Sequence, residues 1–282
     1  MRVLVFGRTG QVARELQRYE GVTALGRDEA DFNDVETCAK RVHEASVDVV
    51  INATAYTAVD NAETDADQAY RVNADTVGAI ARATAERGLP FLHISTDYVF
   101  DGAGERPWRE VDATAPLGVY GASKLHGEEL VRAARGCHAI LRTSWVVSAH
   151  GKNFVKTMLR LGAEREVLTV VADQIGAPTC AGDIAQTLMA MARQLSNDPG
   201  KSGLYHYSGT PNVSWANFAR EIFHQAGIDC KVEDIPSSAY PTPAKRPVNS
   251  RLDCTEIDTV FGVKRPDWRV GLSKILSDLK AS

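Results

Sequence analysis

The sequence contains few cysteines, and those it has form no recognisable pattern. There are five among 282 residues, which is an odd number, and no two have C-x-x-C spacing. They are Cys38, Cys137, Cys180, Cys230 and Cys254. A scattered, odd set favours reduced thiols over a disulfide framework or a cysteine-based zinc site. We therefore expect a cytoplasmic protein.

Long hydrophobic runs and a strong charge excess are also lacking. The apolar run "RVLVF" at 2–6 breaks at Gly7, so it is too short for a secretory signal, and no other run is long enough to span a bilayer. The formal net charge is −4, so no global basic field favours nucleic acid or an anionic membrane as a partner.

The histidines show no metal-binding pattern. None of the seven has H-E-x-x-H or similar ligand spacing. His93 lies in an apolar strand, where we expect a core histidine with satisfied hydrogen bonds. His126 lies two positions from Lys124, hence on another face of the same helix. Neither is given a role, and no required metal is expected.

The first half of the chain alternates short apolar runs with amphipathic stretches. Strands are expected at 2–6, 22–25, 47–55, 91–95 and 138–147, and helices at 12–19, about 65–87 and 119–134. Continuous apolar strands alternating with helices are typical of a parallel sheet that is covered on both faces. The sequence therefore predicts an α/β fold with a Rossmann-like, doubly wound parallel sheet.

The alternation loosens after about residue 148. Helices are expected at 153–164, 181–195 and 271–280, a strand at 203–209, and a loop at 173–179. The segment 236–253 is rich in proline and serine and has no periodicity. It is either a disordered linker or an ordered loop on the substrate side, and we favour the loop.

Two domains follow from this organisation. Residues 1–150 are expected to form an NAD(P)-binding Rossmann domain, to which 181–210 return. Residues 151–180 and 211–282 are expected to form mainly a smaller C-terminal substrate-binding lobe.

A glycine-rich turn follows the first strand. Gly7 and Gly10 lie between that strand and the next helix, with Ala13 at the third position of the motif. Such a turn lets backbone amides approach a pyrophosphate at the positive end of a helix. The alternative is an ordinary strand-to-helix turn, but the position of the motif favours dinucleotide binding.

The end of the second strand bears on the form of the cofactor. An acidic residue there usually binds the ribose 2′-hydroxyl of NAD, whereas an arginine can pair with the 2′-phosphate of NADP. Arg27 comes before Asp28 here, and Arg8 of the glycine turn could support it. We therefore expect NADPH, with NADH as a further acceptable cofactor. The alternative is that Arg27 is merely solvated.

Three residues combine into a candidate catalytic set. Thr96 leaves the fourth strand at its carboxyl end, where doubly wound folds bind ligands. Tyr120 and Lys124 share one face of the next helix. Reduction of a ketone needs a proton donor at the developing alkoxide. A nearby ammonium is expected to lower the pKa of Tyr120, and Lys124 can also bind the nicotinamide ribose.

Motifs along nearly the whole chain resemble those of the extended short-chain dehydrogenase/reductases, and more narrowly those of the dTDP-4-dehydrorhamnose reductase group. The matching segments include "STDYVFDG", "PLGVYGASKLHGEE" and "DQIGAPT". The more specific ones are "TAVDNAE", "RTSWVV" and "AYPTPAKRPVNSRL".

The resemblance implies roles for individual residues. Tyr120 is the implied proton donor, Lys124 its partner, and Thr96 the group that binds the reacting oxygen. The cofactor-binding set is Gly7, Arg8, Thr9, Gly10, Gln11, Val12, Arg27, Asp31, Phe32, Ala53, Ala55, Tyr56, Thr57, Tyr120 and Lys124. The substrate-binding set is Val59, Thr96, Asp97, Tyr98, Tyr120, Trp145, Arg246 and Asn249, the last two near the diphosphate.

The sequence also departs from the pattern of the group. Ala13 replaces the third glycine of the turn, and Val147 stands where many members have tyrosine. Some members carry a magnesium ion held by acids at a dimer interface. Glu15 matches one such position, but we expect it to lie on a solvated helix face.

The implied activity is NADPH-dependent reduction of the C4 ketone of dTDP-4-dehydro-6-deoxy-L-mannose (dTDP-4-dehydrorhamnose) to dTDP-L-rhamnose, a step in polysaccharide biosynthesis. One alternative is a 4-ketoreductase of another deoxysugar nucleotide, which Val147 could mark. Another is a noncatalytic regulatory subunit of the same fold, against which the intact Thr96, Tyr120 and Lys124 set argues. The expected partner is a nucleotide sugar. The chain is expected to be a monomer or homodimer.

Overall fold

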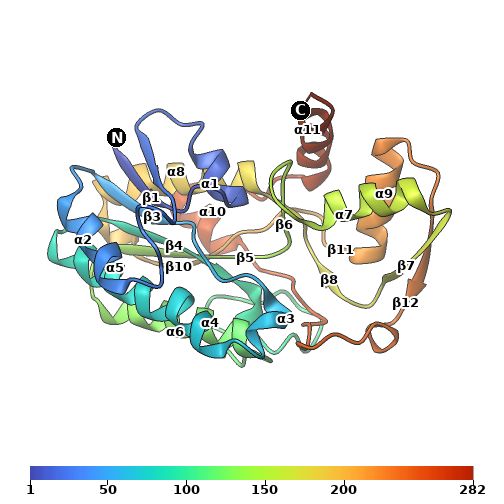
Figure 1. The fold of residues 1–282 in the computed structure, drawn as a ribbon, viewed down its shortest axis with the longest axis horizontal. Coiled ribbons are helices and arrows are strands. Elements are labelled where there is room, and N and C mark those ends of the chain that lie inside the picture. The colour runs from blue at the N-terminus through green and yellow to red at the C-terminus, as the bar shows by residue number, and fades with distance from the viewer. Residues whose placement is uncertain (282) are drawn as a thin grey trace.

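A six-stranded parallel sheet forms the centre of the molecule, whose computed structural model describes residues 1–281. The strand order is β10-β5-β4-β3-β1-β2 (Figure 1). The strands are β1 (Val3–Phe6), β2 (Val22–Leu25), β3 (Val49–Asn52), β4 (Phe91–Thr96), β5 (His138–Thr143) and β10 (Gly203–His206). The chain starts at β1 in the interior of the sheet. It adds β2 on one side and then β3, β4, β5 and β10 on the other, as in a doubly wound fold. The predicted fold class is confirmed.

Helices cover both faces of this sheet (Figure 1). Val3 and Val5 pack on the face covered by α1 (Gln11–Leu16), α8 (Ala181–Asn197) and α10 (Thr255–Phe261). Leu4 and Phe6 pack on the opposite face, against α2 (Val35–Glu44), α5 (Thr76–Glu86) and α6 (Val119–Ala133). Because successive side chains of a strand point to opposite faces, one apolar run supplies both cores.

The predicted helix at 65–87 contains an irregularity. It is divided into α4 (Ala66–Tyr70), a π-helical turn η1 (Arg71–Asp75) and α5. Short helical elements α3 (Val59–Ala62), η2 (Asp97–Val99) and η3 (Pro199–Lys201) occur in the connections. Two expected strands are longer than the observed ones. The strand expected at 47–55 is limited to β3, and that at 138–147 divides into β5 and β6 (Val146–Val147).

A smaller lobe has its own apolar core. It is built from α7 (Phe154–Glu164), α9 (Trp215–Ala226), α11 (Trp268–Ala281) and a two-stranded parallel sheet of β7 (Val167–Val171) and β12 (Lys231–Ile235). Further short elements are β8 (Ile175–Gly176), β9 (Thr179–Cys180), β11 (Val213–Ser214) and η4 (Ser237–Ala239). Helix α10, although it follows the lobe's strands, packs Ile257 and Phe261 into the core of the central sheet.

The Pro/Ser-rich segment 236–253 is ordered, so it is not a disordered linker. Asn249 forms a bridge with Ile175, and Leu252 forms one with Trp108. Ala244 and Ser250 are both about 2% exposed. These contacts fix the segment between the lobe and the carboxyl ends of the central strands.

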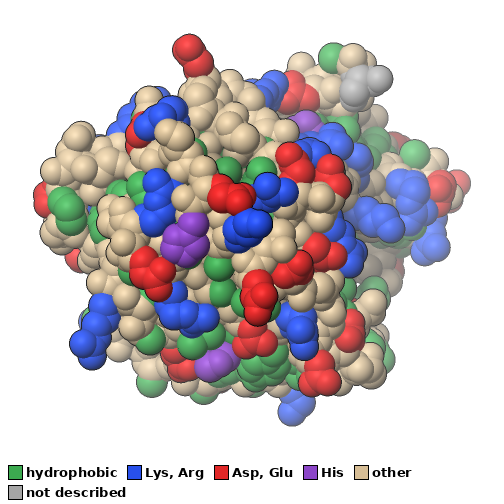
Figure 2. Space-filling view, turned by 60° about the vertical axis from the view of Figure 1, so that its left-hand side comes forward, with side chains coloured by type: hydrophobic (Ala, Val, Ile, Leu, Met, Phe, Trp, Pro, Cys, Tyr) green, Lys and Arg blue, Asp and Glu red, His purple; other side chains and the backbone are tan. Residues whose placement is uncertain are grey.

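No helix among residues 1–281 is long and apolar enough to cross a membrane. Acidic and basic side chains are interspersed over most of the face in Figure 2. All five cysteines are free thiols, four of them buried.

Candidate active site

Thr96 and Tyr120 meet beyond the carboxyl end of β4. Thr96 is the last residue of β4, and Tyr120 lies in the first turn of α6. The Thr96 side chain hydrogen-bonds with the phenol of Tyr120. The ring of Tyr120 packs edge-on against Tyr98, with the centroids 5.4 Å apart. A phenol and a hydroxyl that share a hydrogen bond can act together on one carbonyl oxygen.

A glycine brings α6 close enough for this contact. A Cβ at Gly121 would lie 2.2 Å from the carbonyl oxygen of Tyr98, well inside van der Waals contact. At the start of the helix, the backbone N–H of Val119 donates to the carboxylate of Glu63 at 2.9 Å. The first contact sets how closely α6, which carries Tyr120 and Lys124, approaches Tyr98. The second holds the N-terminal end of α6 in place.

The expected effect of Lys124 on the acidity of Tyr120 is not found. The surrounding protein removes solvent from the phenol and raises the pKa of Tyr120, and the buried Asp97 raises it further. The Thr96 hydrogen bond opposes the rise. Tyr120 is therefore a neutral phenol that holds its proton firmly, and a cation must approach its oxygen before it can release the proton readily.

Lys124 is almost completely enclosed, with 1% of its surface exposed. Its Nζ donates to the carbonyl of Ile94 at 2.7 Å and lies 3.1 Å from His93 Nε2. Burial lowers the pKa of Lys124 to about 8, although Glu128 acts in the opposite direction. His93 is a buried histidine with satisfied hydrogen bonds, as predicted, but the sequence did not show that it touches Lys124. His126 instead faces Glu129 at 3.2 Å.

The glycine turn passes close to the loop after β3, and only its first glycine is sterically required. Gly7 has φ = +110°, and a Cβ there would lie 3.0 Å from Thr54 Oγ1. At Gly10 a Cβ would lie 3.7 Å from the Ala53 carbonyl oxygen. Gly10 is the N-cap of α1 and supplies no side-chain cap, so the first backbone amides of the helix stay available. These residues fit the pyrophosphate of a dinucleotide.

The neighbours of the turn divide into exposed and enclosed positions. Thr9 is exposed, whereas Val12 is 7% exposed and packs in the core, so only its backbone can reach a ligand. The Gln11 side chain accepts hydrogen bonds from Ser148 Oγ at 2.8 Å and Asn153 Nδ2 at 3.0 Å. Gln11 thereby connects the glycine turn to the segment that enters the smaller lobe.

Charges of both signs gather at the end of β2. Arg8 pairs with Asp28 at 3.3 Å and also contacts Glu29. Arg27, whose side chain is 79% exposed, pairs with Asp31 at 3.1 Å. The structure thus offers two arginines for a 2′-phosphate, each already paired with acids. Phe32, predicted at the adenine, is 5% exposed and packs edge-on against Phe6.

The π-helical turn holds the loop that follows β3. Asn73 is fully buried, and its Oδ1 accepts from the Tyr56 backbone N–H at 2.8 Å. Its Nδ2 donates to the Tyr56 carbonyl at 3.1 Å and to Ser123 Oγ on α6 at 3.0 Å. Ala53, Ala55 and Thr57 belong to the same loop. Asn73 is a structural support that the sequence did not reveal, because its partners are 17 and 50 residues away.

Two buried polar atoms at the carboxyl ends of β4 and β5 lack hydrogen-bond partners among residues 1–281: Asp97 Oδ2 and Thr143 Oγ1. The other oxygen of Asp97 accepts from Thr96 Oγ1 at 3.1 Å. Burial raises the pKa of Asp97 to about 6. Buried polar atoms are rarely left unpaired, so these two mark a place where a polar ligand fits.

A cavity of about 670 Å³ lies between Tyr98 and the smaller lobe. Arg246, from the Pro-rich segment, enters it and pairs with Asp60 at 2.6 Å. The cavity is also lined by residues that the sequence reasoning missed: Phe154, Thr157, Arg165, Gln174, Trp215, Tyr240 and Thr242. Its mixture of aromatic walls and two arginines suits a base and a diphosphate.

The remaining expected substrate residues occupy different settings. Trp145 stacks on Trp215, with centroids 3.5 Å apart, and so supports the cavity wall from behind. Val59 begins α3, next to Asp60. Asn249 is 1% exposed, and its Nδ2 donates to the Arg106 carbonyl at 2.8 Å. The contact of Asn249 with a diphosphate stays a prediction.

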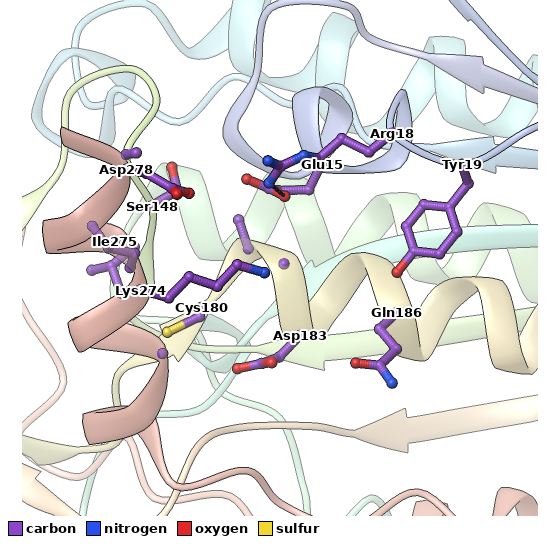
Figure 3. Close-up of a pocket in the computed structure, with 15 residues that line it drawn as sticks. Glu15, Arg18, Tyr19, Ser148, Cys180, Asp183, Gln186, Lys274, Ile275 and Asp278 are labelled. Atoms are coloured by element: carbon purple, nitrogen blue, oxygen red, sulfur yellow. Dashed lines mark hydrogen bonds and ion pairs between the residues drawn. The ribbon is translucent and has the colours of Figure 1, made fainter. Parts of the chain in front are cut away.

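A second cavity, of about 220 Å³, lies between α1, α8 and α11 (Figure 3). Lys274 points into it, between Glu15 and Asp183. The expectation that Glu15 lies on a solvated helix face is wrong: it is 8% exposed and pairs with Arg18 at 2.9 Å and His150 at 3.0 Å. Packing of α1 against α8 and the contact with His150 cover this face. Among residues 1–281, no group of three or more acidic, histidine or cysteine side chains could hold a metal ion.

Comparison with known proteins identifies relatives that match nearly the whole chain. A family model described as the RmlD substrate binding domain matches residues 1–281. Among curated proteins, dTDP-4-dehydrorhamnose reductase of Sinorhizobium fredii is 44% identical over 286 residues, covering 98% of this chain and 97% of the relative. The protein of the same name from Escherichia coli K12 is 44% identical over 295 residues, covering 99% and 98%.

Solved structures agree with these relatives. A dTDP-4-dehydrorhamnose reductase from Clostridium acetobutylicum superposes with a TM-score of 0.93 at 36% identity, covering 99% of this chain and 100% of that one. Another, from Bacillus anthracis and in complex with NADP, superposes with a TM-score of 0.91 at 34% identity, covering 98% and 99%.

Proposed function

The chain belongs to the family of the RmlD substrate binding domain and the dTDP-4-dehydrorhamnose reductases, and we propose that it reduces the C4 ketone of dTDP-4-dehydrorhamnose with NADPH to give dTDP-L-rhamnose. The observation that carries this proposal is the Thr96 and Tyr120 pair at the end of β4, beside Tyr98, which lines a cavity with two arginines. A chain-long identity of 44% to reductases of this name supports it.

The residues present fit the cofactor. The glycine cradle at Gly7 and Gly10 suits the pyrophosphate, and Arg8 and Arg27 suit a 2′-phosphate. When bound, NADPH supplies the hydride for the carbonyl carbon. The relative from Bacillus anthracis was solved with NADP, which supports this form of the cofactor here.

The chain's own side chains handle the proton and the charge. Thr96 donates to the carbonyl oxygen and polarises it, and Tyr120 transfers its phenolic proton to that oxygen as negative charge develops. Lys124 in its ammonium form stabilises the resulting tyrosinate. Asp97 and Tyr98 position the sugar, and Arg246 binds the diphosphate in the larger cavity.

The domains divide this work. We propose that residues 1–150, with 181–210, bind the cofactor, and that 151–180 and 211–282 mainly bind the sugar nucleotide. The protein works in the cytoplasm, as its five free thiols suggest, and acts as a monomer or a homodimer. Sedimentation equilibrium distinguishes the two assembly states.

The test is NADPH oxidation with dTDP-4-dehydrorhamnose generated in situ from its precursor. We expect turnover by the unmodified chain. The variant Tyr120→Phe is expected to bind NADPH normally and to lose most of its turnover, because it lacks the phenolic hydroxyl that supplies the proton. A Tyr120→Phe variant with the original rate would refute the assignment. The same assay with other 4-keto sugar nucleotides tests the substrate.

A further inference from the structure

A buried hydrogen-bond chain runs behind the catalytic lysine. Asn52, at the end of β3, places its Nδ2 3.1 Å from Nδ1 of His93 on β4. The other ring nitrogen of His93, Nε2, lies 3.1 Å from Lys124 Nζ on α6. Asn52 and His93 are fully buried and Lys124 is 1% exposed, so bulk water does not interrupt the chain.

A backbone N–H fixes which groups donate and which accept at one end of this hydrogen-bond chain. The N–H of Thr54 donates to Asn52 Oδ1 at 2.9 Å. Because a backbone N–H cannot accept, the oxygen of the Asn52 amide must face Thr54, and its NH₂ group must face His93. Nδ1 of His93 therefore accepts a hydrogen bond. A neutral imidazole has one N–H, so the proton of His93 is on Nε2.

This tautomer points an N–H at Lys124. An ammonium group has three donors and no acceptor, whereas an amine has a lone pair. The ammonium form would put N–H groups against each other across the 3.1 Å contact between His93 and Lys124. The amine form accepts from His93 and still donates to the Ile94 carbonyl at 2.7 Å. An imidazolium does not relieve this conflict, since it also donates from Nε2, and burial lowers the pKa of His93 well below its usual value.

The charged groups around Lys124 do not remove this preference. Glu128, one turn further along α6, favours the ammonium, but Arg142 of β5 binds both of its oxygens at 2.6 and 2.8 Å. Ser95 of β4 donates to one of them as well, at 2.6 Å. On η2 the only acid is the buried Asp97.

Asp60 of α3 is half-buried and pairs with Arg246 at 2.6 Å, whereas the remaining ionic side chains on the other elements packed against α6 lie at the surface. These exposed residues are Glu63 of the α3 C-cap, Asp67 of α4, Arg71 and Asp75 of η1, and Arg82 and Glu86 of α5. The neutral side chain in direct contact with Nζ is that of His93.

We propose that Asn52 and His93 form a directional hydrogen-bond chain that destabilises the ammonium form of Lys124, so that this lysine loses its proton at a lower pH than an ordinary lysine does. His93 is then a positioning residue that sets the pH range in which the lysine is charged. Its consequence for turnover rests on the proposed reductase function. Because charged Lys124 stabilises the tyrosinate of Tyr120, turnover falls on the alkaline side as the lysine loses its proton.

The first test reads the tautomer directly and does not depend on activity. The full chain is labelled with ¹⁵N-histidine, and the ring nitrogens are observed by NMR from roughly pH 6 to 8. His206 is a matched internal reference, because it is also fully buried but its Nδ1 faces the Trp108 carbonyl at 3.0 Å. His206 should carry its proton on Nδ1, and His93 on Nε2. The variants His93→Gln and His206→Gln assign the signals. A proton on Nδ1 of His93, or an imidazolium, overturns the proposal.

The second test uses Asn52→Asp to reverse the direction of the hydrogen bonds between residue 52, His93 and Lys124. A carboxylate keeps the bond from Thr54 but accepts from His93 Nδ1, so that Nε2 becomes an acceptor for the ammonium of Lys124. We expect the alkaline limb of kcat/KM to move up by about one pH unit or more. His206→Gln should leave the limb in place. An unshifted limb in a folded, active Asn52→Asp variant contradicts the proposal.

The two tests separate this inference from the proposed function. If the unmodified chain reduces no sugar nucleotide, the reductase function fails, and the tautomer of His93 still decides the inference. If Asn52→Asp does not fold, the NMR result for the unmodified chain decides it as well.

Discussion

Arg246 and Asp60 form an ion pair with a separation of 2.6 Å between a guanidinium nitrogen and a carboxylate oxygen. The pair joins the Pro-rich segment of the C-terminal part to α3, 186 residues earlier in the chain. Both residues line the larger cavity, where they connect the two halves of the candidate substrate site. An incoming diphosphate would compete with Asp60 for the same guanidinium.

Substitution of this arginine should weaken nucleotide binding. We expect Arg246→Gln to raise the Kd of dTDP about 10-fold or more, since a hydrogen bond to a charged group contributes about 1.5–3 kcal/mol. Titration calorimetry with dTDP measures the change. Arg160→Gln is the matched control, because Arg160 lies on α7 and pairs with Glu164 at the surface. Equal affinities of the two variants would remove Arg246 from the diphosphate site.

Arg27 should decide part of the cofactor preference. Its side chain is 79% exposed and pairs with Asp31, so its replacement should not disturb the fold. We expect Arg27→Gln to raise the KM for NADPH by about 10-fold and to leave the KM for NADH nearly unchanged, because only NADPH carries the 2′-phosphate. Steady-state kinetics with both cofactors provides the internal control. Equal changes in the KM values for NADPH and NADH would mean that Arg27 does not bind the 2′-phosphate.

The close approach of α6 to η2 predicts an unusual cost for a helical alanine. Alanine normally stabilises a helix relative to glycine by up to about 1 kcal/mol. At Gly121 its Cβ would lie 2.2 Å from the Tyr98 carbonyl oxygen, so we expect Gly121→Ala to lower the free energy of unfolding by more than about 1 kcal/mol and to reduce kcat.

A second glycine of the chain offers the matched control for this change. A Cβ at Gly182, in α8, would lie 3.7 Å from Glu15, which is ordinary contact. Gly182→Ala should therefore be neutral or stabilising in urea unfolding. If both alanines behave alike, the contact at Gly121 does not set the position of α6.

Asp97 should make stability depend on pH. Its pKa is raised from 3.8 to about 6, mainly by burial. The folded state therefore keeps this proton while the unfolded chain releases it, and stability falls as pH rises from roughly 4 to roughly 6, by about 3 kcal/mol from this group.

Urea unfolding across that range tests the Asp97 assignment. The variant Asp97→Asn has no such proton, so its stability relative to the unmodified chain should increase between pH 4 and 6 and then stay level. A constant difference across the range would show that Asp97 titrates normally.

Much of the fold could be read from the chain because its signals are local. The apolar runs at 22–25 and 91–95 mark the strands β2 and β4 almost to the residue. The helix that carries Tyr120 and Lys124 was placed within one residue of its ends. The parallel pair β7–β12 was not predicted, since each strand is partly exposed and has its partner 64 residues away.

By itself the sequence determined the strand–turn–helix units, and with them the chemical types at the site: a glycine cradle, a hydroxyl, a phenol and a lysine. Spacing within one element carries this information, because i and i+4 residues share a helix face whatever surrounds them. Only the tertiary structure decided the environment of each group. It raised rather than lowered the pKa of Tyr120, covered Glu15, and set His93 against Lys124. Burial and long-range hydrogen bonds determine such properties, and both arise only when distant segments pack together.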